Sequence, residues 1–307
     1  MISILDSILP QRETALALGF FDGVHRGHWA VIDAAVNCAA AEGLLPCVFT
    51  FTTGSSTPQG KTGYTWLTTR QEKERLLRSR GIELVVAPDF EEIRGLTPQQ
   101  FVADVLVGQL RARVLSCGED FHFGKNAAAG AQQLIEICRP LGVRVQVVSA
   151  VSDQGVIVSS TVIRRLIAQG DVAQAARLLG RPFGFAQEVV AGKRLGRKLG
   201  FPTTNQRLPE GMTLPAPGVY ATRTWVEGKA LPSVTSIGPQ PTVGGQEPLA
   251  ETYIMGYSGD LYGQEIKVEL IERLRPVVRF DTVEQLRQQV MQDAEDAARL
   301  LGGQMNK

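Results

Sequence analysis

The segment Ala15–Gly43, ALALGFFDGVHRGHWAVIDAAVNCAAAEG, decides the fold of the first half of the chain. It begins as a short apolar run typical of a buried strand, passes through a glycine-containing turn and continues as a helical pattern that ends at Gly43. The same pairing of strand and helix then repeats. Further buried strands are expected in residues 46–51, 83–89, 112–118 and 143–151, and helices in residues 68–81 and 97–110.

Strict alternation of strands and helices predicts a parallel sheet covered on both faces, with ligands bound beyond the carboxyl ends of the strands. The first half is therefore expected to be a doubly wound, Rossmann-like α/β domain. Two short helical patterns close it, at residues 160–170 and 171–180, and each ends at a glycine.

After Pro182 the pattern changes to short alternating stretches separated by turns that contain glycine and proline. They lie in residues 186–192, 218–226, 233–238, 250–257 and 265–274. Several short strands without intervening helices predict a small antiparallel β-barrel, followed by one amphipathic helix in residues 282–302. The domains are expected to span residues 1–182 and 183–307.

Composition limits the classes of function. Thirty-two basic and 31 acidic residues leave a formal charge of +1, which argues against a nucleic-acid partner or a membrane surface. The four cysteines lie far apart in apolar segments, as buried free thiols do, and they favour a reducing cytoplasm. No apolar run reaches membrane-spanning length. We expect a cytoplasmic protein that is a monomer or a weak homo-oligomer.

Two of the chain's three histidines, His25 and His28, stand three residues apart where the first expected strand gives way to the first expected helix. Glycines let the backbone approach a ligand here, and the free N–H groups of a helix start favour anions. The alternative, a glycine-rich turn with incidental surface histidines, does not explain why the histidines gather there. The predicted nucleotide-phosphate site contains Gly19, Phe20, Phe21, Gly23, His25, Gly27 and His28.

A second segment, Val158–Leu166, offers the hydroxyls of Ser159, Ser160 and Thr161 at a helix start and Arg164 one turn later. This combination suits the binding of a leaving pyrophosphate. If the segment stood alone, an ordinary helix cap with a solvated arginine would be the better interpretation.

The third histidine lies in the loop Gly118–Gly130, after the fourth expected strand. Phe121 and Phe123 flank His122 and are candidates to stack on a planar ring, with Asp120 facing the nucleotide. By residues alone, an aromatic loop that packs on its own domain is an equal alternative.

In the second half, Ala191–Asn205, AGKRLGRKLGFPTTN, places three glycines among four basic residues, which suits a polyphosphate. The Thr203 hydroxyl and the Asn205 amide oxygen are hard ligands for Mg²⁺. Composition alone favours a basic hairpin on the barrel. The expected nucleotide contacts are Gly192, Lys193, Gly196, Arg197, Gly200, Pro202, Thr203 and Asn205.

These motifs resemble known families. GFFDGVHRGH (residues 19–28) and SSTVIR (residues 159–164) resemble the HxGH nucleotidyltransferases, which transfer an adenylyl group and release pyrophosphate; the resemblance implies catalytic roles for His25, His28 and Arg164. GEDFHFG (residues 118–124) is similar to a segment of the flavin-specific branch, the bacterial bifunctional riboflavin kinases and FMN adenylyltransferases. This implies flavin contacts from Phe121, His122 and Phe123.

The second half resembles the kinase barrel of that branch. GRKLGFPTTN (residues 196–205) matches the riboflavin kinase signature GRxLGFPTxN, and AETYIM (residues 250–255) is similar to the strand that carries the general base. The resemblance implies that Glu251 is this base and a flavin contact, and that Arg275 contacts the flavin. It also implies Mg²⁺, ATP as co-substrate, and riboflavin, FMN and FAD as ligands.

Three segments depart from the family pattern. Thr50–Gly60 replaces a segment that contains proline and histidine, the loop after Phe123 carries Ala127 and Ala128 where an arginine often stands, and Tyr253 replaces a common histidine. The sequence therefore predicts a bifunctional flavin-cofactor synthase. It leaves two alternatives, a riboflavin kinase with an impaired adenylyltransferase domain and a non-catalytic sensor of flavins or nucleotides.

Overall fold

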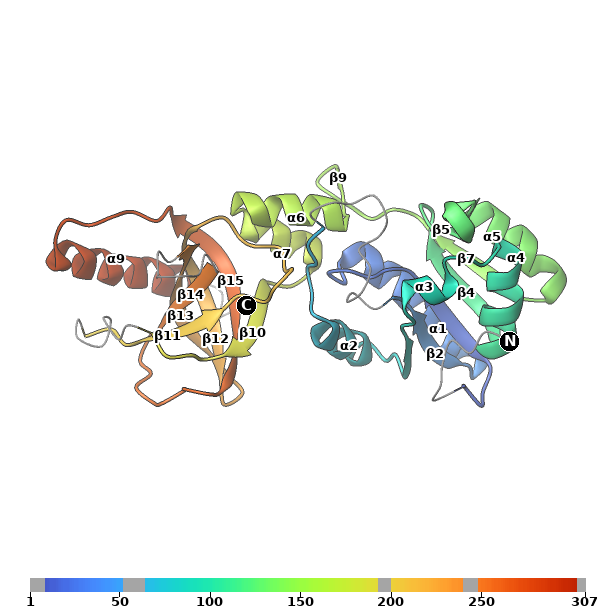
Figure 1. Cartoon of the computed structure of the whole chain (residues 1–307), viewed down its shortest axis with the longest axis horizontal. Helices are drawn as coiled ribbons and strands as arrows, with labels where there is room; N and C mark the ends of the chain where they lie inside the picture. Colours follow the sequence, from blue (N-terminus) through green and yellow to red (C-terminus); the bar gives the residue numbers. More distant parts are fainter. Residues whose placement is uncertain (1–8, 52–63, 193–199, 240–247, 303–307) are drawn as a thin grey trace. The chain divides into compact units, whose positions relative to one another are not determined.

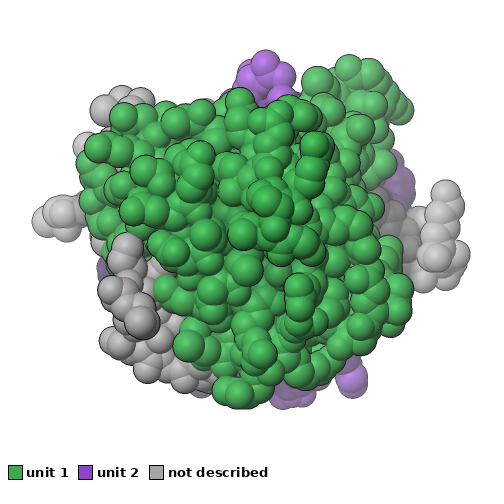
Figure 2. All heavy atoms as spheres, turned by 90° about the vertical axis from the view of Figure 1, so that its right-hand side faces the viewer, with its two compact units in different colours: residues 1–160 green, residues 161–307 purple. Residues whose placement is uncertain are grey.

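The computed structural model of the 307-residue chain describes residues 9–51, 64–192, 200–239 and 248–302. The chain divides into two compact units, Met1–Ser160 and Thr161–Lys307, which Figure 2 shows in different colours. Helices α6 (Ser160–Gln169) and α7 (Val172–Leu179) lie between this division and the predicted domain boundary after residue 182. The boundary at 182 itself stays a prediction.

The first unit is built on a five-stranded parallel sheet, three strands of which (β2, β4 and β7) are labelled in Figure 1. Its strand order is β3-β2-β1-β4-β7. This order, with β1 at the centre, confirms the predicted doubly wound α/β fold. The strands are β1 (Thr14–Leu18), β2 (Leu45–Phe49), β3 (Leu84–Val86), β4 (Ala112–Gly118) and β7 (Arg144–Val148).

Both faces of this sheet are covered, as the continuous apolar strands require. Leu16 and Leu18 face a core that η1 and α5 complete, whereas Ala17 faces a second core shared with α1 and α2. The helical segments are α1 (Arg26–Glu42), α2 (Arg70–Ser79), α3 (Phe90–Ile93), α4 (Pro98–Gln100), the π-helix η1 (Phe101–Gln109) and α5 (Ala131–Cys138). Shorter elements are β5 (His122–Phe123), η2 (Lys125–Ala127), β6 (Ala129–Gly130), η3 (Arg139–Leu141), β8 (Ser152–Asp153) and β9 (Val156–Ile157).

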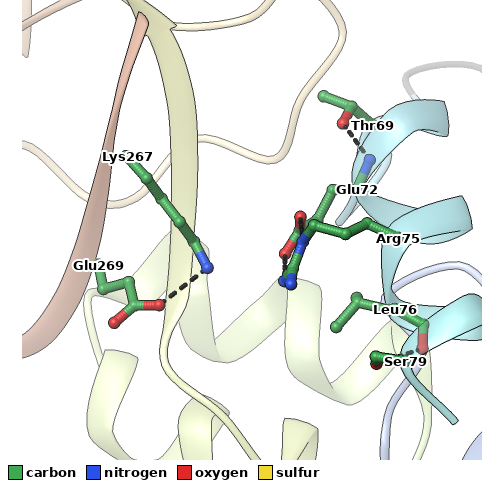
Figure 3. Close-up of polar contacts among 7 residues, drawn as sticks. All are labelled: Thr69, Glu72, Arg75, Leu76, Ser79, Lys267 and Glu269. Atoms are coloured by element: carbon green, nitrogen blue, oxygen red, sulfur yellow. Dashed lines mark hydrogen bonds and ion pairs between the residues drawn. The ribbon is translucent and has the colours of Figure 1, made fainter. Parts of the chain in front are cut away.

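Local capping explains where α2 begins (Figure 3). The Thr69 side chain accepts a hydrogen bond from the Glu72 backbone N–H at 3.1 Å, and Arg75 pairs with Glu72 at 2.7 Å. At the other end the Ser79 hydroxyl donates to the Leu76 carbonyl at 2.7 Å. Arg75 and Ser79 lie on the exposed face of α2, whereas Leu76 and Leu77 pack into the core that α2 shares with α1 and β1.

The second unit contains a six-stranded antiparallel sheet with the order β10-β15-β12-β13-β14-β11. Its edges meet just beyond β10, where the Val190 N–H donates to the Asn205 carbonyl at 2.8 Å, in agreement with the predicted barrel. The strands are β10 (Phe183–Glu188), β11 (Thr203–Arg207), β12 (Gly218–Val226), β13 (Lys229–Pro239), β14 (Pro248–Ile254) and β15 (Glu265–Arg275).

The two faces of the barrel sheet differ in chemistry. Val219, Ala221 and Val234 pack against the final helix, α9 (Val283–Gly302). The alternate residues of the same strands form a buried row of hydroxyls, in which Thr222 lies 2.8 Å from Ser233 and Thr235 lies 2.9 Å from Thr252. Each buried hydroxyl therefore has a hydrogen-bond partner, which is the condition for burying it at low cost. On β15, Lys267 pairs with Glu269 at 2.8 Å (Figure 3).

All four cysteines are free, as the sequence indicated. Burial raises the pKa of the Cys47 thiol to about 12 and that of Cys117 and Cys138 to about 11. These thiols stay protonated and unreactive near neutral pH. In the described part of the chain no helix combines the length and the apolar content that spanning a membrane requires.

Candidate active sites

The turn between β1 and α1 brings His25 and His28 into direct contact. His25 is the N-cap of α1, 4% exposed, and its Nδ1 accepts a hydrogen bond from the His28 backbone N–H at 3.2 Å. In the neutral ring this leaves the proton on Nε2. The two imidazole rings stack with their centroids 3.5 Å apart, and Phe21 meets His28 edge-on at 5.3 Å. The predicted histidine pair is thus assembled at the positive end of a 17-residue helix.

The backbone of this turn is strained. Phe21 and Val24 have φ values of 52° and 40°, which non-glycine residues rarely adopt, and a β-branched residue such as valine least of all. A Cβ on Gly19 would lie 2.8 Å from the Phe21 ring, so only glycine fits there. Phe21 itself is buried in the core. Strain of this kind persists only where surrounding contacts enforce it, and it gathers at functional sites.

Five residues that sequence reasoning missed enforce the turn: Asp22, Tyr64, Leu67, Thr68 and Lys73. The buried Asp22 carboxylate accepts hydrogen bonds from the Leu67 N–H at 2.9 Å and the Tyr64 hydroxyl at 3.0 Å. The Gly23 N–H donates to the Thr68 hydroxyl at 3.2 Å, and the Lys73 ammonium donates to the Phe20 carbonyl at 3.0 Å. One signal was available, because Lys73 shares the i, i+3, i+4 stripe of Leu76 and Leu77, the buried face of α2.

The SSTVIR segment meets the same turn at its beginning. The Ser160 hydroxyl donates to the Asp22 carbonyl at 2.9 Å, and a Cβ on Gly27 would lie 3.5 Å from the Val158 carbonyl oxygen. Ser159 and Ser160 therefore lie beside the start of α1. Thr161 and Arg164 continue on α6 within the second compact unit, and their part in the first site stays a prediction.

In the loop after β4, the predicted flavin residues divide between core and surface. Phe123 is buried and packs on Phe101 with ring centroids 5.8 Å apart, whereas Phe121 is half-buried and stacks on Phe123 at 5.6 Å. Asp120 and His122 are exposed, and the Asp120 carbonyl lies 2.8 Å from His122 Nδ1. Asp120, Phe121 and His122 are therefore the members of this loop that a ligand can reach.

In the barrel, the strand register places the predicted base opposite a predicted metal ligand. Asn205 on β11 is directly opposite Glu251 on β14, and Thr203 is opposite Tyr253. Directly opposite residues of antiparallel strands share a face, so these four side chains form one patch. This pairing could not be predicted from local sequence patterns, because Asn205 and Glu251 are far apart along the chain.

The Asn205 side chain is suited to be a metal ligand. It is 5% exposed, and its Oδ1 has no hydrogen-bond donor among the residues that the structure describes. A buried amide oxygen without a donor is costly unless a bound group satisfies it, and amide and hydroxyl oxygens suit Mg²⁺. Within the described ranges no group of three or more His, Cys, Asp or Glu side chains is placed to hold a metal ion. Asn205 and Thr203 thus fit a Mg²⁺ ion that also binds nucleotide phosphates.

We predict that replacing Gly192 by alanine weakens this site. A Cβ at Gly192 would lie 2.3 Å from Asn205 Nδ2 and 3.0 Å from its Oδ1, so the amide must move. Overpacking of this kind costs about 1–3 kcal/mol. Expressed at the nucleotide site, this cost raises the KM for Mg-ATP in the predicted riboflavin phosphorylation about 5- to 150-fold. Steady-state kinetics measures it. Gly238→Ala is the control, since its Cβ would meet only Val277 at 3.7 Å, and a wild-type KM in Gly192→Ala would contradict the prediction.

A pocket of about 160 Å³ adjoins this patch. Its walls are mostly apolar and come from β10–β11, the end of β14 and residues 257–262, with Thr203 among the lining residues. The lining residues are Val189, Pro202, Thr203, Thr204, Ile254, Tyr257, Ser258, Gly259, Asp260, Leu261 and Tyr262. Among the predicted nucleotide contacts, Pro202 and Thr203 line this pocket and Gly200 is exposed, whereas Lys193, Gly196 and Arg197 lie outside the described residues.

Arg275, the predicted flavin contact, forms an ion pair with a residue of the last helix. Its guanidinium forms hydrogen bonds of 2.7 and 2.9 Å to the Asp293 carboxylate, which is on α9 and is 3% exposed. The sequence did not single out Asp293. A second role of Arg275 toward a flavin stays a prediction.

Two family models match the chain, one on each half. The FAD synthetase model matches residues 8–162 and the riboflavin kinase model matches residues 179–301. Together with the parallel sheet and the barrel, these matches define a two-domain, nucleotide-using transferase.

Curated relatives specify the family. The bifunctional riboflavin kinase/FMN adenylyltransferase of Escherichia coli K12 is 34% identical over 301 residues, which cover 95% of this chain and 94% of that protein. The protein of the same description from Bacillus subtilis is 31% identical, with 94% and 93% covered. The chain belongs to the family of bifunctional riboflavin kinase/FMN adenylyltransferases.

A solved structure supports the fold along almost the whole chain. A crystal structure described as a macrolide-efflux protein from Streptococcus pneumoniae superposes with a TM-score of 0.85 at 30% identity, covering 93% of this chain and 94% of that one. Only the fold of that protein is carried over to this chain.

Proposed function

We propose that this chain catalyses two successive steps of flavin cofactor synthesis: ATP phosphorylates riboflavin to FMN, and a second ATP adenylylates FMN to FAD with release of pyrophosphate. The proposal rests on one observation above all. The chain holds a stacked histidine pair at the start of α1 in one unit and an Asn205–Glu251 pair on the barrel in the other. The two reactions thus have separate sites.

At the barrel, Glu251 takes the proton from the ribityl hydroxyl of riboflavin as that oxygen attacks the γ-phosphorus of ATP. The bond between the γ-phosphorus and the bridging oxygen breaks, and ADP leaves. Thr203 and Asn205 hold Mg²⁺, which neutralises phosphate charge when bound. The apolar pocket beside Thr203 is of the right kind to take the adenine ring.

At the β1–α1 turn, a phosphate oxygen of FMN attacks the α-phosphorus of ATP and pyrophosphate leaves. His25, His28 and the N–H groups at the start of α1 stabilise the charge on the transferring group, because they are fixed in place before the reaction. Ser159, Ser160, Thr161 and Arg164 bind the leaving pyrophosphate. The chain works in the cytoplasm as a monomer or weak homo-oligomer.

ATP labelled at single phosphates tests this assignment. With riboflavin as substrate, a γ-label should enter FMN and remain in FAD, and an α-label should enter FAD alone. With FMN as substrate, a γ-label should appear in pyrophosphate and not in the flavin. An α-label that never reaches a flavin would contradict adenylyl transfer, and a γ-label that never does would contradict the kinase.

A further inference from the structure

Lys73 is the one buried lysine among the residues that the structure describes, with 5% of its surface exposed. It lies on the inner face of α2 beside Leu76 and Leu77. Burying an ammonium group is costly unless polar groups replace its water, so a lysine in this position calls for a reason beyond packing.

The contacts of the ammonium give that reason. Nζ donates to the Phe20 carbonyl at 3.0 Å, lies 3.5 Å from the Thr50 hydroxyl oxygen and sits over the Phe20 ring at 5.0 Å from its centroid. The Thr50 hydroxyl also donates to the Phe20 carbonyl, at 2.8 Å. The Phe20 carbonyl thus accepts two hydrogen bonds, one from Lys73 on α2 and one from Thr50 just after β2. No carboxylate in the described part of the chain forms an ion pair with Lys73 within 4.0 Å.

The carbonyl they hold belongs to the strained turn. Phe20 immediately precedes Phe21, whose φ is 52°, and the turn leads to Val24 and the N-cap His25. Such a backbone conformation relaxes unless neighbouring contacts enforce it. The hydrogen bonds to the Phe20 carbonyl therefore help to set the orientation of the two imidazole rings. Residues 64–73 also form hydrogen bonds with the two turn residues after Phe21. The Leu67 N–H donates to the Asp22 carboxylate, and the Thr68 hydroxyl accepts from the Gly23 N–H.

We propose that Lys73 is a positioning residue for adenylyl transfer: with Thr50 it holds the Phe20 carbonyl and so fixes the turn that presents His25 and His28 to ATP. This inference rests on the function proposed for the first site. Lys73 acts through Phe20 and does not itself contact the reacting phosphorus. A displacement of about 1 Å at a reacting centre is enough to lower a rate about 100-fold.

The titration of Lys73 supplies a readout that a purely structural residue lacks. Burial lowers the pKa of Lys73 to about 8, and the nearby Asp22 carboxylate opposes this shift. Asp22, the charged group that acts on the ammonium, lies in the turn and accepts a hydrogen bond from the phenol of Tyr64 in the segment before α2. Above pH 8 the ammonium loses its charge, so the rate of FAD formation should decline there.

The test uses the full-length chain and two variants of Lys73. Lys73→Met removes both charge and donor at similar volume, and Lys73→Arg keeps the charge at all working pH values. We expect Lys73→Met to lower kcat for FAD formation from FMN about 100-fold and to lose the alkaline decline near pH 8. Lys73→Arg should have a kcat for FAD formation at least about tenfold higher than that of Lys73→Met, and its kcat should also show no decline near pH 8.

Two controls separate positioning from folding. Arg78→Met alters an exposed cation on the same helix and should keep wild-type rates, and FMN formation from riboflavin in each preparation reports on the other unit. Thr50→Val removes the second donor to Phe20 and should lower kcat several-fold, with less than additive loss when combined with Lys73→Met.

The possible outcomes decide between the claims. If the wild-type chain forms no FAD, the proposed function of the first site fails. If it forms FAD and Lys73→Met forms it at the same rate, or if both Lys73 variants keep the wild-type decline above pH 8, the positioning role fails. Unfolding of Lys73→Met in circular dichroism, together with a wild-type kcat in Thr50→Val, would likewise overturn it.

Discussion

Replacing His28 by alanine is expected to lower the rate of FAD formation from FMN by about 100- to 1000-fold, and to leave riboflavin phosphorylation unchanged. His28 lies at the start of α1, stacked on His25 at 3.5 Å, and its proposed role is to donate a hydrogen bond to the transferring phosphate. Removing one such preorganised donor raises the barrier by about 3–4 kcal/mol. Steady-state assays of the two half-reactions, each started from its own flavin substrate, measure both effects.

His28 is the better choice for this test because His25 also caps α1. Its loss would remove the hydrogen bond from the His28 N–H and cost about 1 kcal/mol of helix stability in addition. Asn37→Ala, an exposed position on the same helix, is the matched control and should keep both activities. An unchanged rate of FAD formation in His28→Ala would mean that the histidine pair does not form the adenylyl-transfer site.

The second large effect is expected for Glu251→Gln, which should reduce FMN formation by about 100- to 10,000-fold and leave FAD formation from FMN intact. Glutamine keeps the shape of the side chain opposite Asn205 and loses the ability to accept a proton. FMN is measured by chromatography after incubation of riboflavin with Mg-ATP.

Glu272→Gln provides the comparison, because Glu272 is an exposed carboxylate on β15 of the same barrel. Both variants lose one negative charge, so a difference in their rates of FMN formation shows a role specific to Glu251 and not an effect of net charge. Riboflavin phosphorylation that survives in Glu251→Gln would remove Glu251 as the base.

The fold was readable from local patterns where these patterns are strong. The apolar run of β1, the glycines after it and the periodicity of α1 predict the strand, turn and helix that the structure contains. The π-helical geometry of η1 was not readable, because residues 97–110 carry an ordinary capped helix pattern. A local pattern fixes the period of a segment and leaves its exact hydrogen bonding to the packing around it.

Much of the candidate sites depends on contacts between residues far apart in the sequence. Asp22 looks like an ordinary surface charge in the sequence, and the stripe that Lys73 shares with Leu76 and Leu77 does not reveal its partners. Both side chains are buried against groups that lie 42 to 53 residues away in the sequence. The pairing of Asn205 with Glu251 depends on strand register, which turns and packing set jointly. Arg275 was assigned to a flavin by resemblance, whereas its partner in the structure, Asp293, lies on a helix whose polar pattern did not distinguish it.

The strained turn carries the clearest link between structure and activity. Glycine at positions 19 and 23 was predicted from the need for close approach, and the structure adds a steric reason at Gly19, the ring of Phe21. The positive φ values of Phe21 and Val24 have no signal in the sequence, because neither residue favours that conformation. Such departures from local preference are expected at functional sites.

The central claim, that one chain carries both activities, is tested most directly by a time course with riboflavin and Mg-ATP as the only substrates. The account predicts that FMN appears first and FAD follows, with one pyrophosphate released for each FAD. Accumulation of FMN alone, without FAD or pyrophosphate, would contradict the account and leave a riboflavin kinase. Formation of neither flavin product by folded protein would contradict both halves of it.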